Sequence, residues 1–329
     1  MGEKTLIHEI WREYPEIEKA LKETKQTMRK GISIRIPDIE AKIQEYIDAP
    51  GKYLRAGLSL MFFYMENGSM NKKIITYAAA IELLHLATLI HDDVIDSADL
   101  RRGIEAMHIA QSNKIAVYAG DYLFSYSGRL VSNLIDEVQF QNRNKWILEN
   151  IMSGELRQLA NTFNKEMTMI DYIRQIRGKT AMLFGLSASG GYYLANNDIR
   201  KAQNVRLLGT YLGIAFQLQD DLIDFLVPAG TSGKPSMQDV PNGIYTAPLL
   251  LAMEKSDSVR RYVNETVEWD EASLDKLSLM MKETGAFHDT EVLIERYIEK
   301  ALFYLDKISD SEYKAQIKKI ILLISNRQY

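Results

Sequence analysis

The chain has 329 residues, of which 46% are hydrophobic, and its formal charge is −4 with acidic and basic residues interspersed. This composition supports a large folded core and excludes a strongly basic surface of the kind that binds nucleic acid. The sequence has no cysteine, which excludes disulfide bonds, thiolate metal ligands and cysteine nucleophiles.

The N-terminal residues include acids and no sustained apolar stretch, unlike a secretory signal or an arginine-rich transit peptide. The longest uncharged apolar stretch, Leu207 to Leu218, is well short of the roughly 20 residues that span a bilayer. The sequence therefore predicts a cytoplasmic protein without a transmembrane segment.

Apolar residues recur at helical spacing along most of the chain, which has only 7 prolines and no hairpin dipeptide between alternating apolar runs. These patterns predict an all-α fold, a large helical bundle formed by one domain over residues 1–329. The predicted helices, in chain order, cover Ile39–Ile47, Leu54–Glu66, Ile74–Ile95, Ala116–Leu134, Asn144–Asn164, Met167–Ile176, Thr180–Leu194, Ala202–Phe225 and Tyr245–Met253, followed by C-terminal helices.

Two breaks interrupt the helical pattern, at Ser97–Gly103 and at Val227–Gly243, where glycine and proline predict loops. Each break directly follows a cluster of aspartates. No low-complexity segment or linker divides the chain.

The two clusters share the pattern DDxxD, with Asp92, Asp93 and Asp96 in the first copy. The second copy has Asp220, Asp221 and Asp224. Residues four apart lie on one helix face, so the outer aspartates of each copy form a pair of carboxylates. Their repulsion inside apolar helices calls for hard divalent cations, and Mg²⁺ prefers one or two carboxylates together with phosphate oxygens.

The alternative is that each cluster is a solvated acidic helix end. Both copies, however, end an apolar helix, where the helix dipole disfavours acids, and both precede a loop with basic residues. This repeated context favours the metal-binding interpretation.

Basic residues follow or precede the clusters at several points, and arginine and lysine both bind phosphate oxygens. Taken alone, each lysine or arginine is more often a surface cation, and a histidine within an apolar helix is more often a core residue. The candidates are Lys52, Arg55, His85, Arg101, Arg102 and Lys234.

Together these residues resemble the trans-isoprenyl diphosphate synthase family, and their pattern is most similar to catalytic subunits of hexaprenyl or heptaprenyl diphosphate synthases. The matching segments keep the family's order over nearly the whole chain. They are GKYLR at 51–55, IELLH at 81–85, HDDVIDSADLRRG at 91–103, AGDYLF at 119–124, GKTA at 178–181, FQLQDDLID at 216–224 and GKP at 233–235.

The resemblance implies an isoprenoid synthase fold with a central cavity, and three magnesium ions bound by Asp92, Asp96, Asp220 and Asp224, with Asp93 and Asp221 supporting. It implies an allylic diphosphate held by Arg101, Lys179 and Lys234. Isopentenyl diphosphate would be held by Lys52, Arg55, His85 and Arg102. Gln217, Thr180 and the Lys179 carbonyl would stabilise the allylic cation.

Two positions depart from the pattern that the family often shows. Met237 stands where glycine is frequent, and Ile244 where short-chain members often have lysine. Ile244 cannot bind phosphate, which makes a short-chain product less expected.

Product length is expected to depend on the helix that leads into Asp92. On a helix, Thr88, Ala87, Leu84, Ile81, Ala80 and Tyr77 lie at increasing depth on an arc beside the Asp92 face. In the family an aromatic residue four or five positions before the first aspartate blocks the growing chain, whereas this chain has Thr88 and Ala87. Leu84, Ile81 and Tyr77 follow at roughly 12, 16 and 22 Å. The expected product has about six or seven isoprene units (C30–C35), with a four-unit product as the alternative.

A terpene cyclase of the same fold and a non-catalytic subunit of a heteromeric synthase stay open as alternatives. The second complete DDxxD argues against a cyclase, and a non-catalytic subunit is expected to have lost one of the two motifs. The resemblance implies a homodimer, or a heterodimer with a small subunit.

Overall fold

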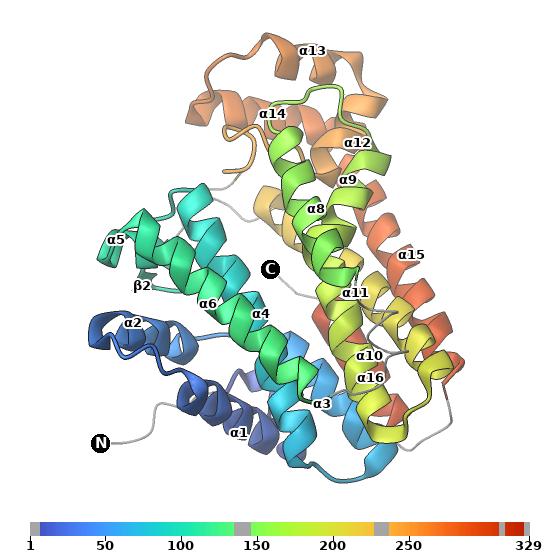
Figure 1. The fold of residues 1–329 in the computed structure, drawn as a ribbon. Coiled ribbons are helices and arrows are strands. Elements are labelled where there is room, and N and C mark those ends of the chain that lie inside the picture. Colours follow the sequence, from blue (N-terminus) through green and yellow to red (C-terminus); the bar gives the residue numbers. More distant parts are fainter. Residues whose placement is uncertain (1–6, 135–145, 227–236, 309–312, 326–329) are drawn as a thin grey trace. The chain divides into compact units, whose positions relative to one another are not determined.

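The computed structural model describes residues 7–134, 146–226, 237–308 and 313–325 (Figure 1). Over these residues the chain is almost entirely helical, which confirms the predicted all-α fold. The exception is a pair of two-residue antiparallel strands, β1 (Leu100–Arg101) and β2 (Ile104–Glu105), in and just after the first predicted loop.

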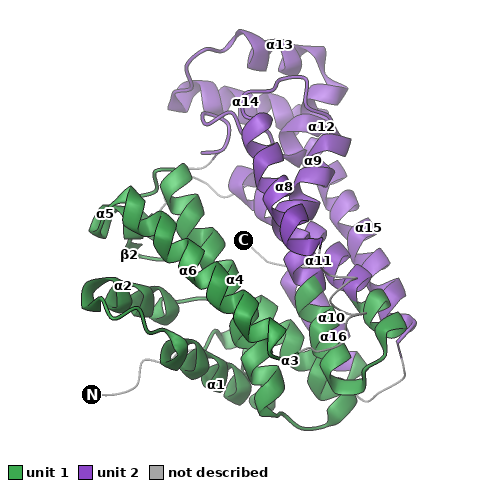
Figure 2. Ribbon diagram, viewed as in Figure 1, with its two compact units in different colours: residues 1–144, 186–205, 311–314 green, residues 145–185, 206–310, 315–329 purple. Residues whose placement is uncertain are grey.

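The chain forms two compact units (Figure 2). Unit 1 comprises residues 1–144, 186–205 and 311–314, and unit 2 comprises residues 145–185, 206–310 and 315–329. A single domain over residues 1–329 stays a prediction.

Unit 1 is built around one long helix, α4, which packs against four others. Its helices are α1 (Pro15–Gly31), α2 (Pro37–Asp48), α3 (Leu54–Asn67), α4 (Lys72–Ile95), α5 (Met107–Ala110) and α6 (Asn113–Ser132), together with the parts of α10 (Met182–Asn196) and α11 (Ile199–Leu226) within residues 186–205. The neighbours of α4 are α1, α3, α5 and α6.

The sequence of α4 accounts for its central place. Asn71 caps its first turn by accepting hydrogen bonds from the backbone N–H groups of Lys73 and Ile74. The helix is apolar on all sides, as is typical of a helix buried in a core. In the part of the chain that the structure describes, it is the one helix long and apolar enough to cross a membrane, yet 72% of its most apolar stretch is buried. A core helix has these properties.

Unit 1 also contains a short 3-10 helix, Glu9–Trp11, and unit 2 contains the rest of the described helices. They are α8 (Ile147–Ala160), α9 (Met169–Ile176), a π-helical turn (Arg177–Ala181), α12 (Ala247–Lys255), α13 (Asp257–Glu265), α14 (Glu271–Thr284), α15 (Ala286–Asp306) and most of α16 (Lys314–Ser325), with the remaining parts of α10 and α11. Helix α12 packs against α9, α13, α14 and α15, and α8 packs against the π turn.

Candidate active site

The outer aspartates of the first motif lie at the C-terminal end of α4. Asp96 is the residue at which the helix ends, and its N–H donates to the carbonyl of Asp92 at 2.8 Å. Asp92 is half-buried and Asp96 is exposed. The last turn of α4 therefore holds two carboxylates on one face, both reaching solvent.

The middle aspartate of this motif, Asp93, points into the core and is fully buried. Its carboxylate accepts hydrogen bonds from the Tyr46 hydroxyl at 2.9 Å and from Arg101 Nε at 2.6 Å. The same hydroxyl accepts from the Met107 N–H at 2.8 Å. Asp93 thus joins α4 to α2 and β1. A supporting role for Asp93 beside Asp92 and Asp96 stays a prediction, and this arrangement is compatible with it.

The residues expected to bind isopentenyl diphosphate come together in unit 1. Arg55 Nη1 lies 3.1 Å from His85 Nε2. The Arg102 guanidinium lies over Gly51, where an added Cβ would be 2.5 Å from Arg102 Nη1. Lys52, next along the chain, is half-buried, and its carbonyl accepts a hydrogen bond from the Trp11 indole.

The electrostatics of this cluster suit an anionic ligand. Burial lowers the pKa of His85 well below its usual value, and the positive charges of Arg55, Arg102 and Arg101 lower it further. His85 is therefore a neutral imidazole among cationic groups, which leaves the positive potential to the arginines and Lys52.

Backbone strain accompanies the same cluster. Tyr53 has φ = 48° and Arg102 has φ = 53°, both in the left-handed region that non-glycine residues rarely adopt. Ser97, which follows the first motif, has φ = 51°. Such conformations are concentrated at functional sites because the surrounding structure must hold them in place.

The second motif lies near the end of α11 in unit 2 and repeats the arrangement of the first. Asp220 and Asp224 are half-buried, whereas Asp221 is 5% exposed. Asp221 accepts hydrogen bonds from the Tyr172 hydroxyl and from Gln217 Nε2, the latter at 2.9 Å. Burial is the main cause that raises the pKa of Asp221 to about 7. In both motifs a buried tyrosine holds the middle aspartate.

The residues expected to stabilise the allylic cation also lie together in unit 2. Thr180 Oγ1 donates to Gln217 Oε1 at 2.8 Å. Since Gln217 Nε2 donates to Asp221, the orientation of the amide is fixed from both ends. Lys179 Nζ forms an ion pair with Glu155 Oε2 at 2.8 Å.

Lys179 and Thr180 belong to the π-helical turn, in which the Met182 N–H donates to the carbonyl of Arg177. This turn lies against α8 at two glycines. A Cβ added to Gly154 would lie 2.3 Å from the backbone nitrogen of Lys179, and one added to Gly178 would lie 2.6 Å from the main-chain carbonyl oxygen of Asn150. Wide turns of this kind are frequent at functional sites.

Lys234 lies outside the described residues. Met237, the first described residue after that gap, is 3% exposed and has φ = 57°. Glycine is favoured in this conformation, which gives a physical reason for the glycine that the family resemblance leads one to expect at this position. Ile244 is half-buried, and its N–H donates to the carbonyl of Asp239 at 2.9 Å.

The proposed chain-length residues lie on α4 and are buried, except for half-buried Thr88: Tyr77, Ile81, Leu84 and Ala87 are at most 5% exposed. The Tyr77 hydroxyl donates to the Leu186 carbonyl on α10 at 2.8 Å. A Cβ on Gly190 would lie 1.9 Å from that hydroxyl oxygen. Tyr77 is thus fixed against α10 within unit 1.

Sequence reasoning missed four residues that hold the others in place: Tyr46, Tyr172, Glu155 and Glu82. The tyrosines could not be assigned because they contact the motifs from distant helices. Glu82 had a visible signal, since it is a carboxyl group in the middle of an otherwise apolar helix.

The donor chemistry of the motifs fits magnesium. In the described part of the chain, no three histidine or acidic side chains are grouped closely enough to hold a metal ion without other ligands. Each motif instead offers a pair of carboxylates, and Mg²⁺ is commonly held by one or two carboxylates with substrate phosphates and water. Asp92 with Asp96, and Asp220 with Asp224, are pairs of this kind.

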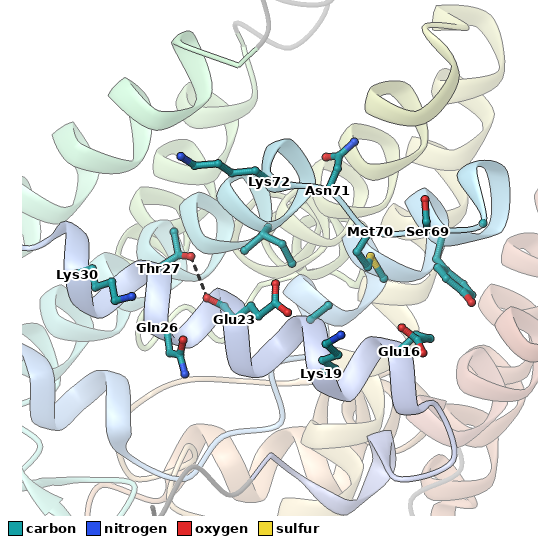
Figure 3. Close-up of a pocket in the computed structure, with 14 residues that line it drawn as sticks. Glu16, Lys19, Glu23, Gln26, Thr27, Lys30, Ser69, Met70, Asn71 and Lys72 are labelled. Carbon is teal, nitrogen blue, oxygen red and sulfur yellow. Dashed lines mark hydrogen bonds between the residues drawn. The ribbon is translucent and has the colours of Figure 1, made fainter.

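A separate polar cavity of about 750 Å³ lies in unit 1 between α1 and the turn into α4 (Figure 3). Its lining residues all fall between Glu16 and Ile75 and include no member of the predicted site. Lysine and glutamate side chains, among them Lys19 and Glu23, are mixed around it (Figure 3).

Comparison with known proteins identifies the family. Residues 37–284 match the family model of polyprenyl synthetases. The heptaprenyl diphosphate synthase component 2 of Geobacillus stearothermophilus is 34% identical over 252 residues, which cover 77% of this chain and 78% of that protein.

Solved structures agree with the sequence comparison. A geranylgeranyl pyrophosphate synthase from Lactobacillus brevis superposes with a TM-score of 0.89 at 26% identity, covering 97% of this chain and 99% of that one. A polyprenyl synthase from Caulobacter crescentus, complexed with calcium and isoprenyl diphosphate, superposes with a TM-score of 0.87 at 26% identity and covers all of both chains. The chain therefore belongs to the polyprenyl synthetase family and is a prenyltransferase with the all-α isoprenoid synthase fold.

Proposed function

We propose that this enzyme lengthens an allylic diphosphate by condensing it with isopentenyl diphosphate and releases an all-trans polyprenyl diphosphate. The observation that carries the proposal is the shared construction of the two motifs. In each, two aspartates lie on one helix face while the middle one is held by a buried tyrosine. This arrangement leaves the outer pairs to bind metal, and the C. crescentus relative is complexed with both a divalent cation and an isoprenyl diphosphate.

Asp92, Asp96, Asp220 and Asp224 would hold magnesium, three ions per site by the family pattern. When bound, magnesium supplies positive charge that stabilises the departing diphosphate. Asp93 and Asp221 act as supports in this scheme, because their carboxylates are engaged by Tyr46 and Tyr172.

Two separate sets of side chains bind the two substrates, and all of their members except His85 are cationic. Lys52, Arg55, neutral His85 and Arg102 bind isopentenyl diphosphate, whereas Arg101, Lys179 and Lys234 bind the allylic diphosphate. Arginine and lysine suit these roles because both donate several hydrogen bonds to phosphate oxygens.

The chemical step breaks the allylic C1–O bond and forms a carbon–carbon bond. The isopentenyl double bond attacks C1, diphosphate leaves with the C–O electron pair, and a proton is lost from the condensed cation to the released diphosphate. Gln217 Oε1 has a second lone pair beside the one that accepts from Thr180, so a fixed partial negative charge is available to the cation. The Thr180 hydroxyl oxygen and the Lys179 carbonyl add dipoles of the same sign.

The proposed product has about six or seven isoprene units, with four units as the alternative. Thr88 and Ala87 are small, and the deeper positions Leu84, Ile81 and Tyr77 follow along α4. Relatives are named both for heptaprenyl and for geranylgeranyl products, so the family alone leaves the length open.

We further propose that the enzyme is cytoplasmic and works as a homodimer or as a heterodimer with a small subunit. The second possibility is supported by the relative that is named as component 2 of a heptaprenyl diphosphate synthase.

The test is to incubate the purified chain with magnesium, farnesyl diphosphate and radiolabelled isopentenyl diphosphate, and to separate the products by chain length. Consumption of isopentenyl diphosphate into a longer prenyl diphosphate supports the proposal. A terpene cyclase would convert the allylic substrate alone. A chain that converts neither farnesyl diphosphate alone nor the mixture with isopentenyl diphosphate would not be active as a homodimer, and adding the small subunit would then separate a catalytic from a non-catalytic subunit of a heteromeric enzyme.

A further inference from the structure

Glu82 is a buried carboxyl group that the proposed mechanism does not use. It lies in the middle of α4 and is 7% exposed. It precedes His85 by three residues, a spacing that places both side chains on one face of the helix. One face of α4 thus carries Glu82 together with a residue of the proposed isopentenyl diphosphate site.

Glu82 completes the first turn of a neighbouring helix. Its Oε1 accepts a hydrogen bond from the Ala56 N–H at 2.9 Å. Ala56 belongs to the first turn of α3, where backbone N–H groups have no partner within the helix. Tyr53, which precedes α3, has left-handed backbone angles, and its side chain makes no capping hydrogen bond. Glu82 therefore supplies from α4 the acceptor that a capping residue supplies in most helices.

The same turn of α3 carries Arg55, the residue just before Ala56. Arg55 Nη1 lies 3.1 Å from His85 Nε2. The beginning of α3 is consequently tied to α4 at two points, from Ala56 to Glu82 and from Arg55 to His85. The contact with Glu82 is made by the backbone N–H of Ala56, so it constrains the position of the neighbouring Arg55 backbone, from which the guanidinium side chain extends.

This contact requires an oxygen acceptor and does not require a negative charge. Burial raises the pKa of Glu82, and the Ala56 N–H and the charges of Arg55 and Arg102 oppose the rise. A carboxyl or amide oxygen retains a lone pair for Ala56 in either case.

We infer that Glu82 is a positioning residue for isopentenyl diphosphate, because it holds the first turn of α3 against α4 and so sets the place of the Arg55 guanidinium. The inference rests on the proposed function, because the proposed function assigns Arg55 to isopentenyl diphosphate.

The experiment compares steady-state kinetics of E82A, E82Q and E82D with those of N71A. Alanine removes the acceptor, aspartate shortens the side chain by one methylene, and glutamine retains an oxygen at the same length. Asn71 is the matched control: it caps the first turn of α4 in the same unit, away from Arg55, and its removal also costs a helix cap.

E82A and E82D should raise the KM for isopentenyl diphosphate at least about tenfold, the size expected for losing a hydrogen bond to a buried group. In these variants the KM for the allylic substrate should stay within about twofold of the wild-type value. E82Q should have a KM for isopentenyl diphosphate close to that of the wild type, because glutamine retains the oxygen acceptor. N71A should lower Tm and leave both KM values unchanged. Since E82D is the milder change, it keeps the test available if E82A does not fold.

The outcome separates the inference from the proposed function. A wild-type enzyme that never consumes isopentenyl diphosphate refutes the proposed function. In an active enzyme, equal changes in both KM values, a change in kcat alone, or an E82Q variant as impaired as E82A would refute the positioning role of Glu82.

Discussion

The hydroxyl of Tyr77 donates a hydrogen bond to the main-chain oxygen of Leu186, and this bond fixes the tyrosine ring of α4 against α10. Tyr77 is 1% exposed and lies roughly 22 Å from Asp92 along the helix. It is the bulkiest of the residues proposed to limit product length.

Tyr77→Ala should therefore lengthen the product, because it removes the ring at the deepest proposed level. Tyr77→Phe retains the ring and should leave the length distribution unchanged. Chromatography of the prenyl products distinguishes the two variants. Identical products from active Ala and Phe variants would show that the chain does not reach Tyr77.

Ala87→Phe should shorten the product to about three or four isoprene units by placing an aromatic ring at the level where this chain has the small residues Ala87 and Thr88. Ala87 is fully buried, so the added ring should also lower the stability by about 1–3 kcal/mol. Product analysis combined with a thermal melt checks both effects. An unchanged product distribution from an active variant would mean that the tail does not pass Ala87.

Substitution within each motif should separate metal binding from support. Asp92→Ala and Asp220→Ala should lower kcat by several orders of magnitude with little change in Tm, because each removes a proposed metal ligand worth several kcal/mol in the transition state. Tyr46→Phe and Tyr172→Phe should instead lower Tm, since each leaves a buried aspartate short of a donor, at a cost of about 1–3 kcal/mol. Near-normal turnover in either folded Asp→Ala variant would contradict the assignment.

Arg101 and Arg102 are neighbours with different surroundings and should behave differently. Arg102→Ala should raise the KM for isopentenyl diphosphate more than that for the allylic substrate, and Arg101→Ala should show the opposite bias. Arg101→Ala should also cost about 3–5 kcal/mol of stability, because Asp93 would be left as a buried carboxylate without its ion-pair partner. Kinetics against each substrate and a urea titration test both statements, and equal effects of the two variants would contradict them.

Met237 combines a left-handed backbone with a buried side chain, and this combination predicts an unusual order of stability. Met237→Gly loses the side-chain burial but also relieves about 1–2 kcal/mol of backbone strain. Met237→Ala loses most of the burial and keeps the strain. The glycine variant should therefore melt at a higher temperature than the alanine variant, and the reverse order would show that this strain is absent.

Helix existence was predictable where apolar residues recur without interruption, as in the segments that became α3, α4 and α11. Helix α1 was missed because its apolar stripe, which includes Ile17, Leu21 and Met28, is hidden among many charged residues. The short pair β1 and β2 could not be expected, since two-residue strands have no periodicity.

The residues of the proposed site were predictable from the sequence where they lie in segments that resemble the family. The spacing of Asp92 and Asp96 on one face follows from helix geometry alone. The partners of Asp93 and Asp221 did not follow, because Tyr46 and Tyr172 approach from helices far away in the sequence. Contacts of this kind depend on packing, which local sequence does not encode.

The crossing of Gly154 and Gly178 has a consequence for protein engineering. Neither backbone has room for a methyl group from the other residue, so α8 and the π turn fit only as a matched pair. Chimeric enzymes assembled from related synthases should exchange residues 147–181 as one block, because a junction inside it would combine two surfaces selected for different partners.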